Sequence, residues 1–251
     1  VLKRRIIPIQ LLMDDRLVKS KEFSAFRDVG DPISSSKIYS AQDADELVFL
    51  NINRDNQSLS TLIHYVEKIA QDCFVPLTVG GGISKISDAR SLFKAGADKV
   101  LINTAAYSNP DLIKEIADQF GSQSLVVGFD IKAQNGDYAV FSNCGRKKEN
   151  VVLSEHIISV ISAGAGELMV QSIDRDGKMT GYDLNLLRYV LSISKVPVIA
   201  AGGPGNFQDL KDAFDVGVDA VSAGSLFNFG DNNPLRAKAF LNNYNIKLKQ
   251  I

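Results

Sequence analysis

Short apolar runs alternate with segments of helical periodicity along the whole chain, and this alternation is the most regular feature of the sequence. Most of the runs are unbroken stretches of aliphatic or β-branched residues, which is the pattern of strands buried on both faces of a sheet. Eight such strands are predicted, at Ile6–Leu11, Glu46–Asn51, Leu77–Val79, Lys99–Ile102, Leu125–Asp130, Glu167–Ser172, Val198–Ala200 and Ala220–Ala223.

The segments between these runs predict helices. They are expected at Ser35–Gln42, Ser58–Gln71, Ile86–Lys94, Pro110–Phe120, Val152–Ser162, Leu184–Ser192, Phe207–Phe214 and Pro234–Asn243. Pro110 and Pro234 fit the first turn of a helix, where a missing N–H costs little. Gly96, Gly121 and Gly164 follow helices and suit left-handed caps. Eight strand–helix units with right-handed crossovers close most simply into a (β/α)8 TIM barrel, expected to form a single domain over residues 1–251.

The chain also repeats itself. The segment Val75–Gly82 recurs as Val196–Gly203, so the shift from Gly82 to Gly203 is 121 residues. The same shift aligns the downstream residues Phe93, Gly96, Asp98, Asn103 and Thr104 with Phe214, Gly217, Asp219, Gly224 and Ser225. Self-similarity at a fixed spacing indicates a fold assembled from equivalent structural units. The expected architecture is therefore a TIM barrel with a two-fold half-barrel repeat.

Two connections are much longer than is usual between a strand and a helix. They run from Met13 to Asp31 and from Ile131 to Asn150, at equivalent places in the two halves. Both follow the carboxyl ends of strands, where TIM barrels carry their sites, so a function is favoured over mere decoration. Asn135-Gly136 fits a hairpin turn, which predicts a small extra strand pair that includes Tyr138–Ser142.

Composition narrows the classes of function. The chain is 45% hydrophobic with a formal net charge of −1, so it can bury a core and gives no general reason to expect nucleic acid or an anionic membrane as partner. No stretch has the apolar length of a membrane span, and the first residues do not resemble a signal peptide. Cys73 and Cys144 are far apart and lack clustered ligands, which argues against a zinc site and for a reduced, cytoplasmic setting. No metal or cofactor is expected.

The first candidate chemistry lies in the glycine turns after the third and seventh strands. Gly80-Gly81-Gly82 and Gly202-Gly203 allow backbone N–H groups to approach an anion closely, and the following helices add favourable dipoles. In each half a small polar residue follows the next strand. The duplicated arrangement predicts one phosphate group per half, and hence a ligand with a phosphate at each end. A purely structural role for these turns is the alternative.

Asp130 is the candidate for acid–base chemistry, because it ends the fifth strand and is expected to point into the barrel mouth. The repeat places Leu11 at the equivalent position of the first strand. Leucine can neither donate nor accept a proton, so a symmetric acid–base pair is impossible here. A hydrogen-bonded structural carboxylate is the alternative for Asp130.

Three other polar features are open to two interpretations each. The segment Asp174–Gly177 is too short for a calcium loop and fits either the anchoring of substrate hydroxyls or the bracing of a loop. Lys19 fits either the screening of a phosphate or plain surface charge. His64 and His156 fall within predicted helices, where a structural or surface role is favoured over a catalytic one.

Several of these segments resemble the HisF family, the cyclase subunits of imidazole glycerol phosphate synthase. The resemblance is carried by Thr78–Ile83, Gly96–Ala106, Asp174–Gly177 and Gly181–Asp183, and it runs essentially from end to end. It implies a (β/α)8 barrel that receives ammonia from a HisH-type glutaminase subunit. In histidine biosynthesis this ammonia meets a ribulose-bearing bis-phosphate and yields imidazole glycerol phosphate and an aminoimidazole ribonucleotide.

The resemblance also implies roles for residues at the barrel mouth. Asp130 would be the surviving catalytic carboxylate and Lys19 a lysine of a mobile loop. The phosphate-binding residues would be Gly82, Asn103 and Thr104 for one phosphate, and Gly177, Gly203, Gly224 and Ser225 for the other. Asp174 and Asp176, from the segment that fits the anchoring of substrate hydroxyls, are further candidates for substrate binding.

At the opposite end of the barrel the resemblance implies an ammonia gate of interleaved charges, formed by Arg5, Glu46, Lys99 and Glu167. Asp98 matches a position of the interface with the glutaminase. A layer of ion pairs that merely seals the barrel floor is the alternative for the four charges. Burying four charges is costly unless they pair with one another, so they are an odd choice for a seal alone.

The departures from the family pattern cluster at the mouth. Leu11 stands where the family carries its other essential aspartate. Further differences are Ile9 for a cysteine, Asn51 for an aspartate, Leu101 and Ala201 for serines, and Gln171 for a threonine. The gate and the partner contact are therefore kept, while the cyclase chemistry is altered.

A second resemblance accounts for this combination. Leu11 and the segment Val29–Pro32 are similar to HisF paralogues of surface-polysaccharide pathways, in which a glutaminase and a HisF-like barrel supply ammonia to a separate amidotransferase that forms an amidino group on a sugar. The leading hypothesis is thus an ammonia-conducting barrel that serves amidination of a nucleotide-linked sugar. The alternatives are a true cyclase in which a carboxylate such as Asp14 substitutes, a non-catalytic ligand-sensing activator of the glutaminase, and a related phosphosugar isomerase.

Overall fold

The computed structural model describes residues 3–53 and 59–249, and within them eight parallel strands close into a barrel. In chain order these strands are β1 (Arg5–Met13), β4 (Leu47–Asn51), β5 (Leu77–Gly80), β6 (Lys99–Ile102), β7 (Leu125–Gln134), β10 (Glu167–Ser172), β11 (Val198–Ala201) and β12 (Ala220–Ala223). Each strand pairs with the next, and β12 pairs with β1, so no edge remains open in the barrel. The expected (β/α)8 architecture is confirmed.

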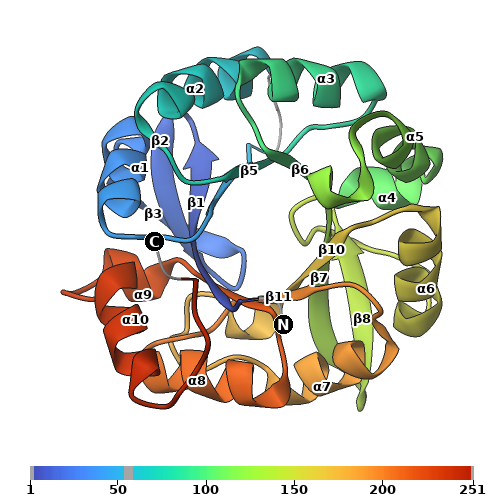
Figure 1. Cartoon of the computed structure of the whole chain (residues 1–251). Helices are drawn as coiled ribbons and strands as arrows, with labels where there is room; N and C mark the ends of the chain where they lie inside the picture. Colours follow the sequence, from blue (N-terminus) through green and yellow to red (C-terminus); the bar gives the residue numbers. More distant parts are fainter. Residues whose placement is uncertain (1–2, 54–58, 250–251) are drawn as a thin grey trace.

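Helices form a ring around these strands (Figure 1). The main ones are α1 (Pro32–Ala41), α2 (Leu59–Asp72), α3 (Ile86–Ala95), α5 (Asp111–Phe120), α6 (Leu153–Ala163), α7 (Leu184–Ile193), α8 (Phe207–Val216) and α10 (Pro234–Asn242). Ser58, the predicted first residue of α2, lies outside the described residues. Gly96 and Gly164 adopt the predicted left-handed caps, with φ of 114° and 116°. The prediction was wrong for Gly121, whose ψ of 146° is extended.

The two halves of the barrel repeat in their hydrogen bonds as well as in their strands. The Asp98 carboxylate accepts a hydrogen bond from the Leu77 N–H at 2.8 Å, and Asp219, 121 residues later, accepts one from the Val198 N–H at 3.0 Å. Asp88 and its counterpart Asp209 each accept bonds from the backbone N–H groups just before their helices. Equivalent positions thus perform equivalent structural tasks in both halves.

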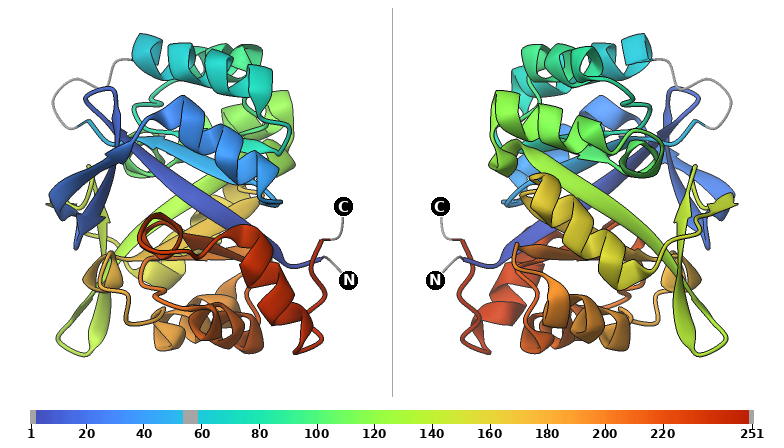
Figure 2. Two further views of the ribbon diagram at one scale, coloured as in Figure 1. Left: turned by 90° about the vertical axis from the view of Figure 1, so that its left-hand side faces the viewer. Right: turned by 90° about the vertical axis from the view of Figure 1, so that its right-hand side faces the viewer.

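Additional antiparallel strands extend two barrel strands beyond the mouth. β8 (Asp137–Ser142) pairs with β7 across the predicted Asn135-Gly136 turn, and the two-residue β9 (Lys147–Lys148) pairs with β8. The other extension, β2 (Arg16–Lys21) and β3 (Ser24–Gly30), forms a hairpin on β1 that the sequence did not predict. Both extensions project from one end of the barrel, opposite the end where Arg4 pairs with Leu248 (Figure 2).

Apolar side chains fill both the space between strands and helices and the inside of the barrel. The inner cluster consists of Ile7, Ile9, Val48, Leu101, Val126, Met169, Ile199, Ala201 and Ala220, with Leu11 and Leu50 packed against it. It separates the charged residues at one end of the barrel from the polar residues at the mouth. In the described part of the chain no helix has the length and apolarity to cross a membrane.

Candidate functional site

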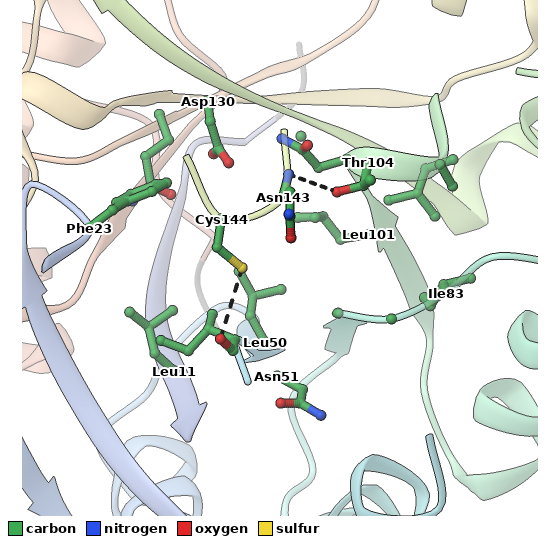
Figure 3. A pocket seen from close by; sticks show the side chains of 18 of the residues that line it. Leu11, Phe23, Leu50, Asn51, Ile83, Leu101, Thr104, Asp130, Asn143 and Cys144 are labelled. Carbon is green, nitrogen blue, oxygen red and sulfur yellow. Dashed lines mark hydrogen bonds between the residues drawn. The ribbon is translucent and has the colours of Figure 1, made fainter. Parts of the chain in front are cut away.

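A cavity of about 280 Å³ lies at the mouth of the barrel and is called here the mouth cavity. Its polar lining includes three predicted phosphate-binding residues of the first half, Gly82, Asn103 and Thr104. Both amide atoms of Asn103 are buried without a hydrogen-bond partner. The Thr104 hydroxyl oxygen accepts a bond from the Asn143 N–H at 3.0 Å, which leaves its own proton free to donate (Figure 3). The cavity therefore offers unused donors where the sequence predicts a phosphate.

Asp130 and Leu11 both line the mouth cavity, and they lie on opposite sides of it (Figure 3). The Asp130 carboxylate points into the cavity, and burial, together with the negative charge of Asp176, raises its pKa to about 7. The wall around Leu11 is apolar and includes Leu50 and Leu101. Asp130 is thus poised to exchange a proton near neutral pH, but it faces an aliphatic side chain.

No other carboxylate of the described residues takes the place opposite Asp130. Asp14 lies exposed in the turn between β1 and β2 and lines neither mouth pocket. Asp176 is close enough to influence Asp130 electrostatically, but its two oxygens already accept hydrogen bonds from Ser20 at 2.6 Å and Gln171 at 3.2 Å. Asp14 therefore does not occupy the place of the missing aspartate, as the cyclase alternative would require.

The raised pKa of Asp130 predicts a pH-dependent effect of Asp130→Asn. In the unfolded chain this carboxyl titrates near pH 4, whereas burial raises its folded pKa to about 7. Between these values the folded state binds more protons than the unfolded state, so stability falls as pH rises through this window. Urea unfolding should show the advantage of Asp130→Asn over the wild type growing from pH 4 to 7 and then levelling off. A constant difference across this range would contradict the assignment.

The second half carries a smaller pocket that contains the other predicted phosphate-binding residues, Gly177, Gly203, Gly224 and Ser225. It meets the mouth cavity at Leu11, Ser20 and Gln171, which line both. Lys19 also lines this smaller pocket. The structure therefore brings together residues from four distant parts of the sequence.

Lys19 is buried rather than a surface charge, because β2 carries it back over β1. Its ammonium donates a hydrogen bond to the Ile9 carbonyl oxygen and lies 2.5 Å from where a Cβ on Gly224 would be. Burial lowers the pKa of Lys19 to about 8, although the nearby Asp176 carboxylate opposes this shift. Burial likewise raises the pKa of Asp176, against the Ser20 hydrogen bond and the Lys19 charge. The smaller pocket thus holds the Lys19 ammonium group, whose positive charge the Asp176 carboxylate balances only in part.

Two glycines of this pocket should respond very differently to alanine. Gly177 has a φ of +68°, and an added Cβ would overlap the Ser20 carbonyl oxygen, so Gly177→Ala should destabilise the protein by roughly 2–3 kcal/mol. Gly224 has an ordinary φ, and its Cβ would meet the movable end of Lys19. Gly224→Ala should therefore change the free energy of unfolding by less than about 1 kcal/mol. Equal losses in urea unfolding would contradict this placement of Lys19.

Some candidate residues do not line these pockets. Asp174 is absent from both linings, and its carboxylate accepts a hydrogen bond from the Ala133 N–H at 2.8 Å, which ties the β7–β8 hairpin to the loop after β10. This contact supports loop bracing, and substrate binding by Asp174 stays a prediction. His156 is buried and stacks on Tyr107, consistent with the structural interpretation. The extensions add Ser20, Phe23, Phe26, Asn143 and Cys144 to the mouth cavity, none of which the sequence analysis proposed as a binding residue.

At the opposite end of the barrel Arg5, Glu46, Lys99 and Glu167 form a closed ring of alternating charge, called here the four-charge ring. Arg5 donates to Glu46 at 2.8 Å and to Glu167 at 2.7 Å, and Lys99 donates to the same carboxylates at 3.0 and 2.9 Å. Thr78 adds a hydroxyl bond to Glu46 at 2.5 Å. Burial alone would lower the pKa of Arg5, but Glu167 and Glu46 outweigh it and hold that pKa above its usual value. The four predicted gate residues are therefore adjacent and mutually paired.

Asp98 lies exposed at this same end, directly before Lys99. Its carboxylate also caps the Leu77 N–H, so it has a structural task independent of any partner. An exposed oxygen beside the four-charge ring is compatible with the predicted contact, which stays a prediction.

These features define a class: a TIM barrel with two related pockets at its mouth and a ring of paired charges at its base. A family model described as "Histidine biosynthesis protein" matches residues 5–233. The chain is 44% identical over 242 residues to the imidazole glycerol phosphate synthase subunit HisF of Dictyoglomus turgidum, with 96% of both chains covered. It is 41% identical over 249 residues to the HisF subunits of Thermotoga sp. and Exiguobacterium sp., covering 99% of this chain and 98% and 97% of theirs. The chain belongs to the histidine biosynthesis protein family and is a HisF-type member of it.

Proposed function

We propose that this chain is the HisF-type subunit of a glutamine amidotransferase complex. It receives ammonia from a HisH-type glutaminase at the four-charge ring and conducts it through the barrel. The ammonia then serves a separate cytoplasmic amidotransferase that amidinates a nucleotide-linked sugar. The observation that carries this proposal is the complete four-charge ring at one end, combined with Leu11 opposite Asp130 at the other.

The interior between these ends supports the passage of a neutral molecule. Above the ring, the inner cluster presents aliphatic side chains such as Ile7, Val48, Val126 and Ile199. An ammonium ion would lose its hydration there without gaining a partner, whereas uncharged ammonia loses far less. The ring therefore marks the boundary between an entrance that tolerates charge and a path that excludes it. For ammonia to pass, the four-charge ring has to rearrange, because its four side chains bond to one another in this structure.

The residues at the mouth support a loss of cyclase chemistry, but they do not support a loss of ligand binding. Leu11 removes one of two proton-transferring groups, and such groups typically contribute ~10²–10⁴-fold in rate. The two pockets nevertheless keep their glycines, Asn103, Thr104 and Lys19. We propose that they still bind a phosphorylated small molecule. In this proposal the bound molecule acts as a signal that stimulates the glutaminase, as in the ligand-sensing alternative.

A deletion of the gene tests the proposed function in the cell. The deletion strain should lack amidino groups on its surface polysaccharide, as read by mass spectrometry of the purified glycan, and it should grow without histidine. Introduced into a strain that lacks its histidine-pathway cyclase, the gene should fail to restore growth. Restoration of growth together with an unchanged glycan would overturn the proposal.

The second candidate function is that of a cyclase in histidine biosynthesis. It is favoured by the extent of the similarity, since the HisF relatives match this chain at 41–44% identity over nearly its whole length. Against it stands the lack of a free carboxylate opposite Asp130 in the described residues. The complementation arm of the experiment decides between the two functions.

A further inference from the structure

The most exposed large apolar side chain of the described residues is Phe74, which is 89% accessible, whereas the next are 56% accessible. It lies in the connection from α2 to β5, three residues before the strand begins. Strands of the barrel begin at the end that carries the four-charge ring, so Phe74 lies at that end. Isolated apolar side chains on a surface need no explanation, but an almost fully accessible phenylalanine beside a candidate functional feature does.

Two further aromatic residues lie at the same end, at the ends of neighbouring helices. Phe93 in α3 and Phe120 in α5 are partly buried, and their ring centroids are 4.4 Å apart. The exposed Asp98 follows α3 and precedes β6. Phe74, Phe93 and Phe120 are called here the aromatic sector. Aromatic side chains with a polar rim are the composition that distinguishes the centres of protein interfaces.

Two buried groups of charges at this end are satisfied within the chain. The four-charge ring is closed on itself, and Lys238 bonds to Asp43 at 2.9 Å and to Asp45 at 2.8 Å. These two groups of charges have little to gain from a partner, whereas the exposed phenylalanine ring would gain from apolar burial. The backbone at Phe74 is tied to α1, because its N–H donates to the Ser40 hydroxyl at 3.3 Å. Such a contact reduces the backbone entropy that the loop would lose on binding.

We propose that Phe74 is the apolar anchor of the surface that binds the glutaminase subunit, with Phe93, Phe120 and Asp98 around it. This inference rests on the proposed function, because a partner that delivers ammonia to the four-charge ring must cover the barrel end next to Lys99. The sector spans the helices next to β5 and β6, and Lys99 opens β6. The partner is therefore the glutaminase subunit, and Phe74 inserts into an apolar pocket on the surface of that subunit.

The test measures the affinity of this chain for the HisH-type glutaminase subunit of the same organism by isothermal titration calorimetry. Truncation of a buried interface anchor typically costs 2 kcal/mol or more, so Phe74→Ala should raise the Kd about 30-fold or more. Ile158→Ala is the matched control, because Ile158 is 56% accessible but lies on α6, on the outside of the barrel. It should leave the Kd unchanged. Both variants should melt within a few degrees of the wild type, because neither side chain packs in the core.

The outcomes separate the inference from the proposed function. If the wild-type chain binds the glutaminase and Phe74→Ala binds it equally well, the inference is overturned and the proposed function stands. If the wild-type chain neither binds nor stimulates the glutaminase, both fall together. If sedimentation shows that the chain alone dimerises and that Phe74→Ala abolishes the dimer, the occupant is a second copy and the inference is wrong.

Discussion

Replacement of Glu46 by leucine is expected to destabilise the protein by about 3–5 kcal/mol, the usual cost of removing one partner from a buried ion pair. Glu46 is only 2% exposed and accepts hydrogen bonds from Arg5, Lys99 and Thr78. Without it, two cations share the single carboxylate of Glu167 in a poorly solvated position. Urea unfolding at pH 7 measures the loss. A change of less than about 1 kcal/mol would show that the four-charge ring is open to water.

The matched control replaces the whole ring with apolar residues of similar size, as Arg5→Met, Glu46→Leu, Lys99→Met and Glu167→Leu together. Such replacements of buried ion pairs are often neutral or even stabilising, because the desolvation cost of the charges disappears. The quadruple variant should therefore recover most of the stability lost by Glu46→Leu alone. If it is as unstable as the single variant, the ring contributes net stability and the sealing interpretation gains support.

The stability of the quadruple variant also distinguishes a sealing role of the four-charge ring from a gating role. A floor that only seals a barrel is built more simply from the aliphatic side chains that fill the next layer, such as Ile7 and Val48. If the quadruple variant is as stable as the wild type, the four charges add no net stability and need another reason. The proposed gate supplies one, because alternating cations and carboxylates can exchange partners when the ring rearranges.

The barrel could be predicted because each of its strands is buried on both faces and therefore appears as an apolar run. The 121-residue repeat added a second, independent signal, and the structure bears it out in the paired roles of Asp98 and Asp219. Element ends shifted by a few residues, as for α1, which begins at Pro32 rather than Ser35 because Asp31 caps it. Caps depend on single hydrogen bonds, so a hydrophobic pattern cannot place them precisely in advance.

The β2–β3 hairpin escaped prediction because its turns lack the usual glycine signals. Asp14, Asp15, Glu22 and Phe23 all have positive φ, between 49° and 60°, without being glycine. Positive φ is uncommon for glutamate and phenylalanine, and aspartate, which tolerates it better, is a weaker turn signal than glycine. The consequence reaches the candidate site, because this hairpin carries Lys19 into the smaller pocket and Phe23 to the mouth cavity.

The candidate site was predictable where it depends on strand ends and not where it depends on loops. Asp130, Leu11 and Thr104 lie at or just beyond the ends of predicted strands, so their convergence followed from the topology. Asp174 and Asp176 are two residues apart in one loop, yet one braces a hairpin and the other lines a pocket. The path of a loop decides between such roles, and that path depends on contacts with Ala133 and Ser20 from distant parts of the chain.

Purified with its glutaminase, this chain is expected to make imidazole glycerol phosphate ~10²–10⁴-fold more slowly than a complex built on the Thermotoga HisF subunit. The reason is that Asp130 faces Leu11, so only one of the two proton transfers has a group to perform it. The assay supplies the ribulose-bearing bis-phosphate and an ammonium salt, which removes any dependence on the glutaminase. Product formation is followed by chromatography. A rate equal to that of the Thermotoga complex would contradict the expectation.

Leu11→Asp and Leu11→Asn form the matched pair that assigns the missing rate to proton transfer. Both introduce a polar group of nearly the same size, but only the aspartate can exchange a proton. Leu11→Asp should therefore exceed Leu11→Asn by about tenfold or more in product formation. It should also give a bell-shaped pH profile, because a second carboxylate across the cavity from Asp130 pushes the two pKa values apart. Equal rates for the two variants would mean that Leu11 is not the reason for a slow cyclase, and that the altered surroundings at Asn51 and Leu101 are.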